Sequence, residues 1–177
     1  VIPGGAHTYS RGFDQFPANV PQILDRGEGA YVWDADGRMY LDYGMALRAV
    51  TLGYGYPSVT EGAYQEILKG NNLPRASLTE LEAAELIVDL IPSADMVKFA
   101  KNGSNVTTAA AKVARAYTGR RYICVPRQQP FFSFDDWFIG TTALVKGIPG
   151  EHALSTLIFD YNDINSLKAL FDKYPGE

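Results

Sequence analysis

The fold class is decided by residues 101–125, which read KNGSNVTTAAAKVARAYTGRRYICV. A polar turn at 101–105 comes first. Apolar residues at helical spacing then share one predicted helix face: Val106, Ala109, Ala110, Val113, Ala114 and Tyr117. Gly119 is a natural end for this helix, because glycine adopts the left-handed C-cap conformation without strain. The apolar run 122–125 predicts a strand, and turn, helix and strand in this order are typical of an α/β layer.

The same alternation continues on both sides of this stretch. Upstream, residues 96–100 predict a short strand. Before it, Ser77 with Glu80 predicts a capped helix that buries Ala83, Leu86, Ile87 and Leu90. Downstream, residues 156–159 predict a further strand, and Asn162 is the predicted cap of a helix whose apolar side carries Leu167, Leu170, Phe171 and Tyr174. From residue 78 onward the sequence therefore indicates an α/β fold with a parallel sheet.

The first 70 residues have a different pattern. Residues 1–26 are rich in glycine, proline and polar side chains, and they predict an extended arm. Residues 29–43 predict two strands around a turn with Asp-Gly at the bend, and Pro57 opens a predicted helix that runs to about Lys69. We expect an arm and small-domain segment at 1–70 and a part of a larger α/β domain at 71–177.

The composition is that of a folded chain: 46% of the 177 residues are hydrophobic, and the formal net charge is -4. These values argue against disorder and give no reason to expect nucleic acid as a partner. No apolar run reaches the ~20 residues that span a bilayer, and residues 1–11 lack a signal-peptide core, so we expect no membrane association and a cytoplasmic location. Cys124 is the single cysteine, and His7 and His152 make no metal site by their spacing.

Three segments carry side chains suited to binding. The turn 102–105 precedes a helix, so its free amides and the helix dipole can hold an anion such as phosphate; the alternative is a simple helix cap. Residues 129–138 hold four phenylalanines and a tryptophan, which can stack on a planar ring, clamp the loop into the core or contact another subunit. Arg11 can pair with a carboxylate or remain a solvated charge. A dinucleotide is not expected, because only Gly103 of the three fingerprint glycines is present.

Taken in order, these segments resemble the class III aminotransferases, and their glutamate-1-semialdehyde aminomutase-like branch in particular. The resemblance is carried by Pro3-Gly4-Gly5 with Arg11, the hairpin 29–43, Gly53-Tyr54-Gly55-Tyr56-Pro57, the turn 102–106, the helix segment 114–120 and the loop 131–137. It implies part of a pyridoxal-phosphate (PLP) transferase fold of type I, namely a parallel-sheet fragment of the large domain with an N-terminal arm and a small-domain hairpin.

The resemblance also implies the cofactor, pyridoxal 5'-phosphate, and the residues that hold it. The implied cofactor-binding residues are Gly103, Ser104, Asn105, Phe131 and Phe132, with Phe131 on the ring, and the implied substrate-binding residues are Thr8 and Arg11. The implied partners are a second copy of the chain in a homodimer and a small amino or keto substrate of carboxylate-like or sugar-like chemistry.

Departures from the family's pattern limit what can be carried over. Phe131 stands where the family has tyrosine, Phe132-Ser133 where it has His-Gly, and Asn105-Val106 where it has an acidic residue and alanine. The family's Schiff-base lysine lies beyond Glu177, so no catalytic residue is expected in this chain. We expect a PLP-dependent aminotransferase or aminomutase, of which this chain is the N-terminal half. The alternative is a non-catalytic module that binds phosphate or a partner.

Overall fold

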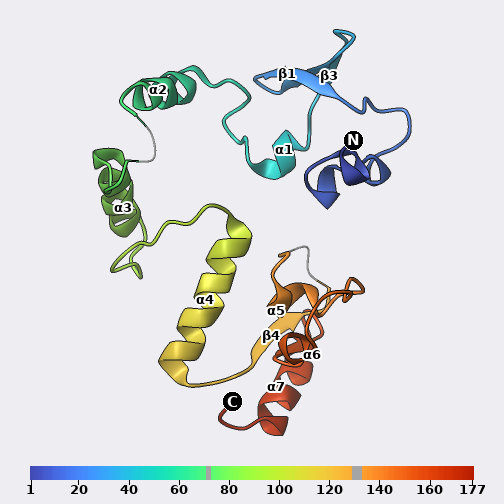
Figure 1. Ribbon diagram of the computed structural model, residues 1–177, viewed down its shortest axis with the longest axis vertical. Helices are drawn as coiled ribbons and strands as arrows, with labels where there is room; N and C mark the ends of the chain where they lie inside the picture. Colours follow the sequence, from blue (N-terminus) through green and yellow to red (C-terminus); the bar gives the residue numbers. More distant parts are fainter. Residues whose placement is uncertain (71–72, 129–132) are drawn as a thin grey trace. The chain divides into compact units, whose positions relative to one another are not determined.

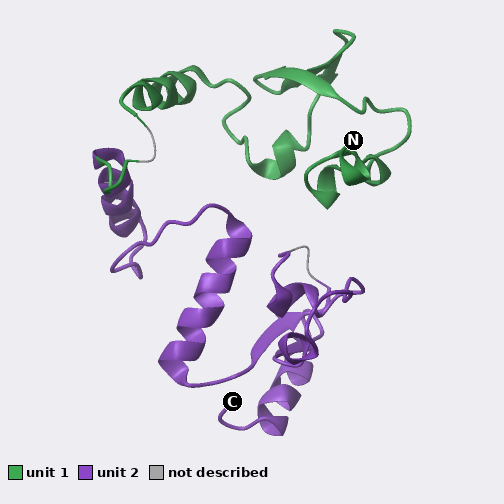
Figure 2. Ribbon diagram, in the orientation of Figure 1, with its two compact units in different colours: residues 1–77 green, residues 78–177 purple. Residues whose placement is uncertain are grey.

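The computed structural model describes residues 1–70, 73–128 and 133–177, and the chain divides into two compact units, 1–77 and 78–177 (Figure 2). The division lies near the boundary expected at residue 70. That the first unit is an arm with a small-domain segment, and the second a part of the large domain, stays a prediction.

The first unit is built on a three-stranded antiparallel sheet of β1 (Leu24–Glu28), β2 (Tyr31–Asp34) and β3 (Met39–Leu41), in that order (Figure 1). The predicted hairpin is therefore confirmed as β2 and β3. Asp34 fixes its turn, because Oδ1 accepts the amides of Asp36 at 3.0 Å and Arg38 at 2.9 Å. Strand β1 was not predicted, since its sequence LDRGE has no apolar alternation; it forms because β2 offers it a hydrogen-bonding edge.

The arm is wound rather than extended, so that prediction is wrong. It contains three short 3-10 turns: η1 (Pro3–Gly5), η2 (Tyr9–Arg11) and η3 (Phe13–Gln15). Gly4 and Gly5 have φ of 71° and 81°, which glycine adopts at no steric cost. The predicted helix after residue 56 is confirmed as α2 (Pro57–Leu68).

A left-handed turn separates the sheet from α2. This element, α1 (Met45–Arg48), has positive φ at all four of its residues, from 43° to 71°. None of them is glycine, and left-handed backbone costs other residues roughly 1–2 kcal/mol each. The turn is therefore a strained element that its surroundings must hold in place.

The second unit contains the predicted parallel sheet. β4 (Ile123–Pro126) pairs in parallel with β5 (Thr156–Phe159), with Ile123 opposite Thr156 and Pro126 opposite Phe159. Along the chain, α5 (Asp136–Ile139) and α6 (Gly150–Ala153) come between these two strands. Helix α7 (Ile164–Lys173) follows β5 and packs on it. The long helix α4 (Gly103–Thr118) leads into β4 (Figure 1). The α/β class is thus confirmed. In the described chain, residues 96–100 form no strand, because an apolar run becomes a strand only when another strand pairs with it.

The apolar faces of two helices are largely exposed, and the first of them was expected to be buried. In α3 (Leu78–Leu90) no residue is buried: Ala83 and Ile87 are half-buried, and Leu86 and Leu90 are 57% and 67% exposed. In α4 the apolar stripe that contains Val113 is exposed as well. The helix instead turns its small and polar side inward, with Ala111 buried and Ser104, Thr107, Thr108 and Arg115 half-buried. Helical periodicity predicts an apolar face, but it does not predict which element, if any, packs against that face.

The last helix begins one residue later than predicted. Asp163 is the cap of α7, and its carboxylate accepts the amides of Asn165 at 3.0 Å and Ser166 at 3.3 Å. Asn162, the predicted cap, has φ of 59°, so it forms the left-handed turn that precedes the cap. Asparagine tolerates this conformation better than most residues, which explains why it stands there.

Candidate functional site

Within the described part of the chain, the N-terminus of α4 presents unpaired backbone donors. Asn102 caps the helix from an extended backbone (φ -158°), and its side-chain oxygen accepts the amide of Asn105 at 3.0 Å. Its carbonyl accepts the amide of Val106 at 3.1 Å. The amides of Gly103 and Ser104 stand at the first two helical positions, where no carbonyl precedes them within the helix. They lie at the positive end of a 16-residue helix, which gives this end the properties of an anion site.

The predicted phosphate turn is therefore the first turn of α4 and not a loop before it. A Cβ built on Gly103 would meet no atom within 4 Å, so the space beside this residue is open in the described part of the chain. The Ser104 side chain is half-buried. The cap already engages the amide of Asn105, whereas the amides of Gly103 and Ser104 have no hydrogen-bond acceptor among the described residues.

A hydrogen-bonded chain joins α4 to the segment that follows β4. The Thr108 hydroxyl donates to Oδ2 of Asp135 at 2.5 Å, and it accepts the indole N–H of Trp137 at 2.7 Å. The backbone carbonyl of Trp137 accepts the hydroxyl of Thr156 at 2.6 Å, and Thr156 is the first residue of β5. One continuous set of bonds therefore connects helix, loop and sheet.

The loop after β4 is held at both of its described ends. Asp160 Oδ1, just past β5, accepts the side-chain amide of Gln128 at 2.9 Å and the Arg127 guanidinium at 3.2 Å. These two donors lower the pKa of the Asp160 carboxyl below its ordinary value and outweigh the opposite effect of burial. Ser133 is fully buried, and its hydroxyl accepts the amide of Asp135 at 3.2 Å.

Phe131, predicted to cover the cofactor ring, and Phe132, predicted to bind the cofactor, lie outside the described residues. The described segments on either side end at Gln128 and begin again at Ser133, the two anchors just named. The carboxylate of this segment that reaches α4 is that of Asp135. The ring-covering role of Phe131 and the cofactor-binding role of Phe132 stay predictions.

The residues predicted to bind substrate lie in the first unit. Thr8 precedes η2 and lines a cavity of about 360 Å³ together with residues on both sides of it, among them Pro3, Tyr9 and Phe13. Arg11 ends η2 with an exposed side chain. The structure thus places both residues in the same short segment, and their role toward a substrate stays a prediction.

Arg11 acts electrostatically on Tyr54, which is hydrogen-bonded to Asp42. The Tyr54 hydroxyl donates to Oδ2 of Asp42 at 2.6 Å, and the amide of Gly44 donates to Oδ1 at 2.8 Å. Burial and the bond to Asp42 raise the pKa of Tyr54, while the Arg11 charge opposes the rise. Burial would raise the pKa of Asp42, but the Tyr54 hydroxyl and nearby amides hold it below its ordinary value. Asp42 therefore remains a carboxylate near neutral pH.

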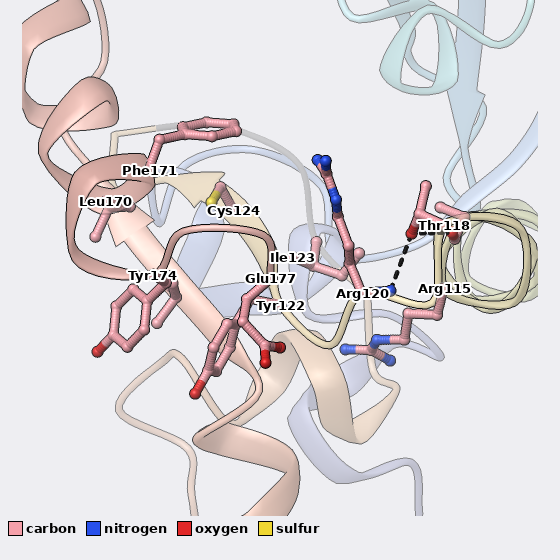
Figure 3. Close-up of a pocket in the computed structure, with 12 residues that line it drawn as sticks. Arg115, Thr118, Arg120, Tyr122, Ile123, Cys124, Leu170, Phe171, Tyr174 and Glu177 are labelled. Carbon is pink, nitrogen blue, oxygen red and sulfur yellow. Dashed lines mark hydrogen bonds between the residues drawn. The ribbon is translucent and has the colours of Figure 1, made fainter.

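A second cavity, of about 370 Å³, lies at the opposite end of α4 (Figure 3). Arg115 and Thr118 line it from α4, and the rings of Tyr122 and Tyr174 lie against each other in it with centroids 4.8 Å apart. Cys124 is half-buried in its wall, and burial raises the pKa of its thiol. Because Asn102 caps the other end of the helix, this cavity is separate from the predicted phosphate site.

Residues 1–70, 73–128 and 133–177 contain no group of three or more histidine, cysteine, aspartate or glutamate side chains placed to hold a metal ion. Over the same residues, none of the helices combines the length and apolar character needed to cross a membrane.

Comparison with known proteins assigns the chain to a family. Residues 13–159 match the family "Aminotransferase class-III", and the chain belongs to the class III aminotransferases. Glutamate-1-semialdehyde 2,1-aminomutase of Chloroflexus aurantiacus is 33% identical over 180 aligned residues, covering 97% of this chain and 40% of that protein. The protein of the same name from Nitrosospira multiformis is 33% identical, covering 99% of this chain and 43% of that protein. The chain thus spans about 40% of the length of these relatives.

Solved structures agree with this assignment. The FumI protein of Sphingopyxis sp. MTA144, in its PLP internal aldimine form, is 32% identical with a TM-score of 0.89, covering 100% of this chain and 42% of its own. An omega-transaminase from Sphaerobacter thermophilus is 26% identical with a TM-score of 0.87, covering 100% of this chain and 43% of its own. The chain has part of a PLP-transferase fold of type I, as the sequence predicted.

Proposed function

We propose that the protein to which this chain belongs is a PLP-dependent aminotransferase or aminomutase. The observation that carries the proposal is the capped N-terminus of α4, with two available amides and a serine hydroxyl, in a chain whose residues 13–159 match the class III family. The cofactor's phosphate fits this end, because it needs N–H donors, a hydroxyl and positive potential. The open space beside Gly103 lets a phosphate approach the backbone closely.

Each predicted residue has a definite task in this proposal. Gly103 and Ser104 bind the phosphate through their amides, and Ser104 adds its hydroxyl; Asn105 contributes through its side chain, since its amide serves the cap. Phe131 covers the pyridine ring, with Phe132 beside it. Bound PLP supplies an electron sink for the amino-group transfer, and the protein supplies orientation and charge.

The substrate in this proposal is a small amino or keto compound with a carboxylate or a sugar-like group. Thr8 and Arg11 bind it, since an exposed guanidinium suits bidentate pairing with a carboxylate. The proposed assembly is a homodimer, as the family resemblance implies, and the proposed location is cytoplasmic.

The test is a cofactor and transfer assay on the full-length protein. The protein is incubated with PLP, free PLP is removed by gel filtration, and bound PLP is measured by absorbance. A panel of amino donors and keto acceptors is then added, and product is followed by chromatography. We expect one PLP per chain and transfer with at least one pair. Retention of PLP without any transfer supports the alternative, a non-catalytic phosphate-binding module, and no retention overturns the proposal.

A further inference from the structure

Thr108 stands one helical turn after Ser104, so both lie on the inward side of α4. Its hydroxyl is used twice, as donor to Asp135 and as acceptor from Trp137. A threonine in a helix ordinarily turns its hydroxyl back to a carbonyl one turn earlier, as Thr107 does toward Gly103. Thr108 instead uses its hydroxyl as a donor to Asp135, 27 residues away, and as an acceptor from Trp137 in the same segment.

Asp135 also departs from its local role. It is the N-cap residue of α5, where an aspartate normally accepts an amide of the helix it begins. Its carboxylate makes no such cap bond and turns to Thr108 instead. The buried Ser133 hydroxyl accepts the backbone amide of Asp135 and so anchors the backbone from which this carboxylate extends. Thr108 and Asp135 are thus hydrogen-bonded to each other, and neither makes the local bond that is usual at its position.

We propose that Thr108 and Asp135 are positioning residues, which fix the N-terminus of α4 against the segment 133–137 so that its first amides stand ready for the cofactor's phosphate. The inference rests on the proposed function. The bond meets α4 one turn from Ser104, close enough that a shift of the helix there moves the phosphate-binding amides. Trp137 extends this connection to β5, because its carbonyl accepts the Thr156 hydroxyl. The position of α4 is thereby fixed relative to the sheet.

The experiment compares two ligands that differ only in the phosphate. Equilibrium dialysis gives the dissociation constants of PLP and of pyridoxal for full-length wild type, Thr108→Val, Asp135→Ala and the double variant. We expect each single variant to raise the constant for PLP about tenfold, the scale of one hydrogen bond to a charged group. The constant for pyridoxal should change by less than about twofold, and the double variant should resemble the single ones because the two residues share one bond.

Two controls separate positioning from general damage. Thr108→Ser keeps the hydroxyl and should restore PLP affinity, whereas Thr118→Val removes a hydroxyl at the far end of α4 and should leave it unchanged. Tryptophan emission, recorded without any ligand, should shift in Thr108→Val and not when the same change is made in a Trp137→Phe background, because the shift arises from the indole of Trp137 losing its acceptor.

The outcomes discriminate between the two ideas. If wild type takes up no PLP, the proposed function fails, and the positioning role fails with it. If wild type takes up PLP but Thr108→Val weakens PLP and pyridoxal equally, or weakens neither, the positioning role alone is overturned. Additive effects in the double variant, or an unshifted Trp137 emission, also overturn it.

Discussion

Ser104 is the residue at which the phosphate proposal can be tested with the smallest change. Ser104→Ala removes the hydroxyl but leaves the amide and the helix dipole. We expect PLP retention to weaken by about 1–2 kcal/mol, roughly 5- to 30-fold, the cost of one hydrogen bond to a charged group. Absorbance titration with PLP measures the change. Thr118→Ala, at the other end of α4, is the matched control and should leave the affinity unchanged.

Phe131 offers a test of ring stacking that is independent of the phosphate. Phe131→Ala should weaken PLP binding by about 0.5–1.5 kcal/mol beyond the lost apolar burial, the scale of an aromatic pair. Phe134→Ala is the control in the same segment, because the Phe134 side chain is 59% exposed. Equal losses in the two variants, measured by the same titration, would contradict a specific ring-binding role for Phe131.

At the scale of the element, the left-handed turn α1 gives a stability prediction. Ala46 has φ of 50°, so Ala46→Gly relieves backbone strain of about 1–2 kcal/mol in the folded state. Glycine also makes the unfolded chain more flexible, which cancels about 0.4–1 kcal/mol of that gain. We expect the free energy of unfolding to rise by about 0.5–1 kcal/mol. Ala63→Gly, in the right-handed helix α2, should lower it by about 1 kcal/mol. Denaturant titration of both variants measures the contrast.

The hairpin β2–β3 gives a prediction about pH. Burial would raise the pKa of Asp34, but the amides of Arg38 and Asp36 and the Tyr40 hydroxyl lower it below 3.8. Because the pKa of Asp34 is lower in the folded state than in the unfolded state, the carboxylate stabilises the fold at any pH above the ordinary aspartate pKa. This contribution is lost as the pH falls through the folded-state pKa. Tyr40→Phe removes the hydrogen bond from the Tyr40 hydroxyl to the Asp34 carboxylate. The free energy of unfolding should therefore fall less steeply with decreasing pH in this variant than in wild type.

Denaturant unfolding between about pH 7 and about pH 3 measures the difference between the two slopes. Tyr64→Phe is the control, since the Tyr64 side chain is 54% exposed on α2. Parallel acid profiles for wild type and Tyr40→Phe would show that the Asp34–Tyr40 bond does not contribute to the pH dependence.

Local signals predicted the elements well where one residue fixes the backbone. Gly119 ends α4 with φ of 70°, Pro57 begins α2, and the turn after Asp34 joins β2 to β3, all as expected from their side chains. The capped N-terminus of α4 was also predictable, because a cap residue and an adjacent glycine mark a helix N-terminus in the sequence itself.

Features that depend on a distant neighbour were not predictable. The run 96–100 is apolar but unpaired in the described chain, and α4 packs through Ala111 rather than through the stripe that contains Val113. The Thr108–Asp135 bond joins residues 27 positions apart, and no spacing rule links them. A sequence pattern states that a side chain is apolar or polar, but only the fold states what it meets.

At the scale of the whole molecule, the exposed apolar faces of α3 and α4 bear on assembly. Leu86, Leu90, Val113 and Tyr117 are all more than half exposed. We expect the full-length protein to be a dimer, because the resemblance places the active site of such folds between two subunits. Light scattering at micromolar concentration measures the mass. A single monomeric species across that range would contradict the dimer.

The parallel pairing of β4 with β5 has a consequence during synthesis on the ribosome. The roughly 30 residues between the strands delay the arrival of β5 by about 2–6 s at ordinary rates of translation, and during that time β4 has an apolar edge and no partner. Arg120 and Arg121 precede the strand, Pro126 ends it, and Arg127 follows. Positive charges and a proline at the ends of an apolar segment oppose pairing between nascent chains. We therefore expect these arginines to weaken pairing through β4 between neighbouring chains on one messenger before β5 has been made.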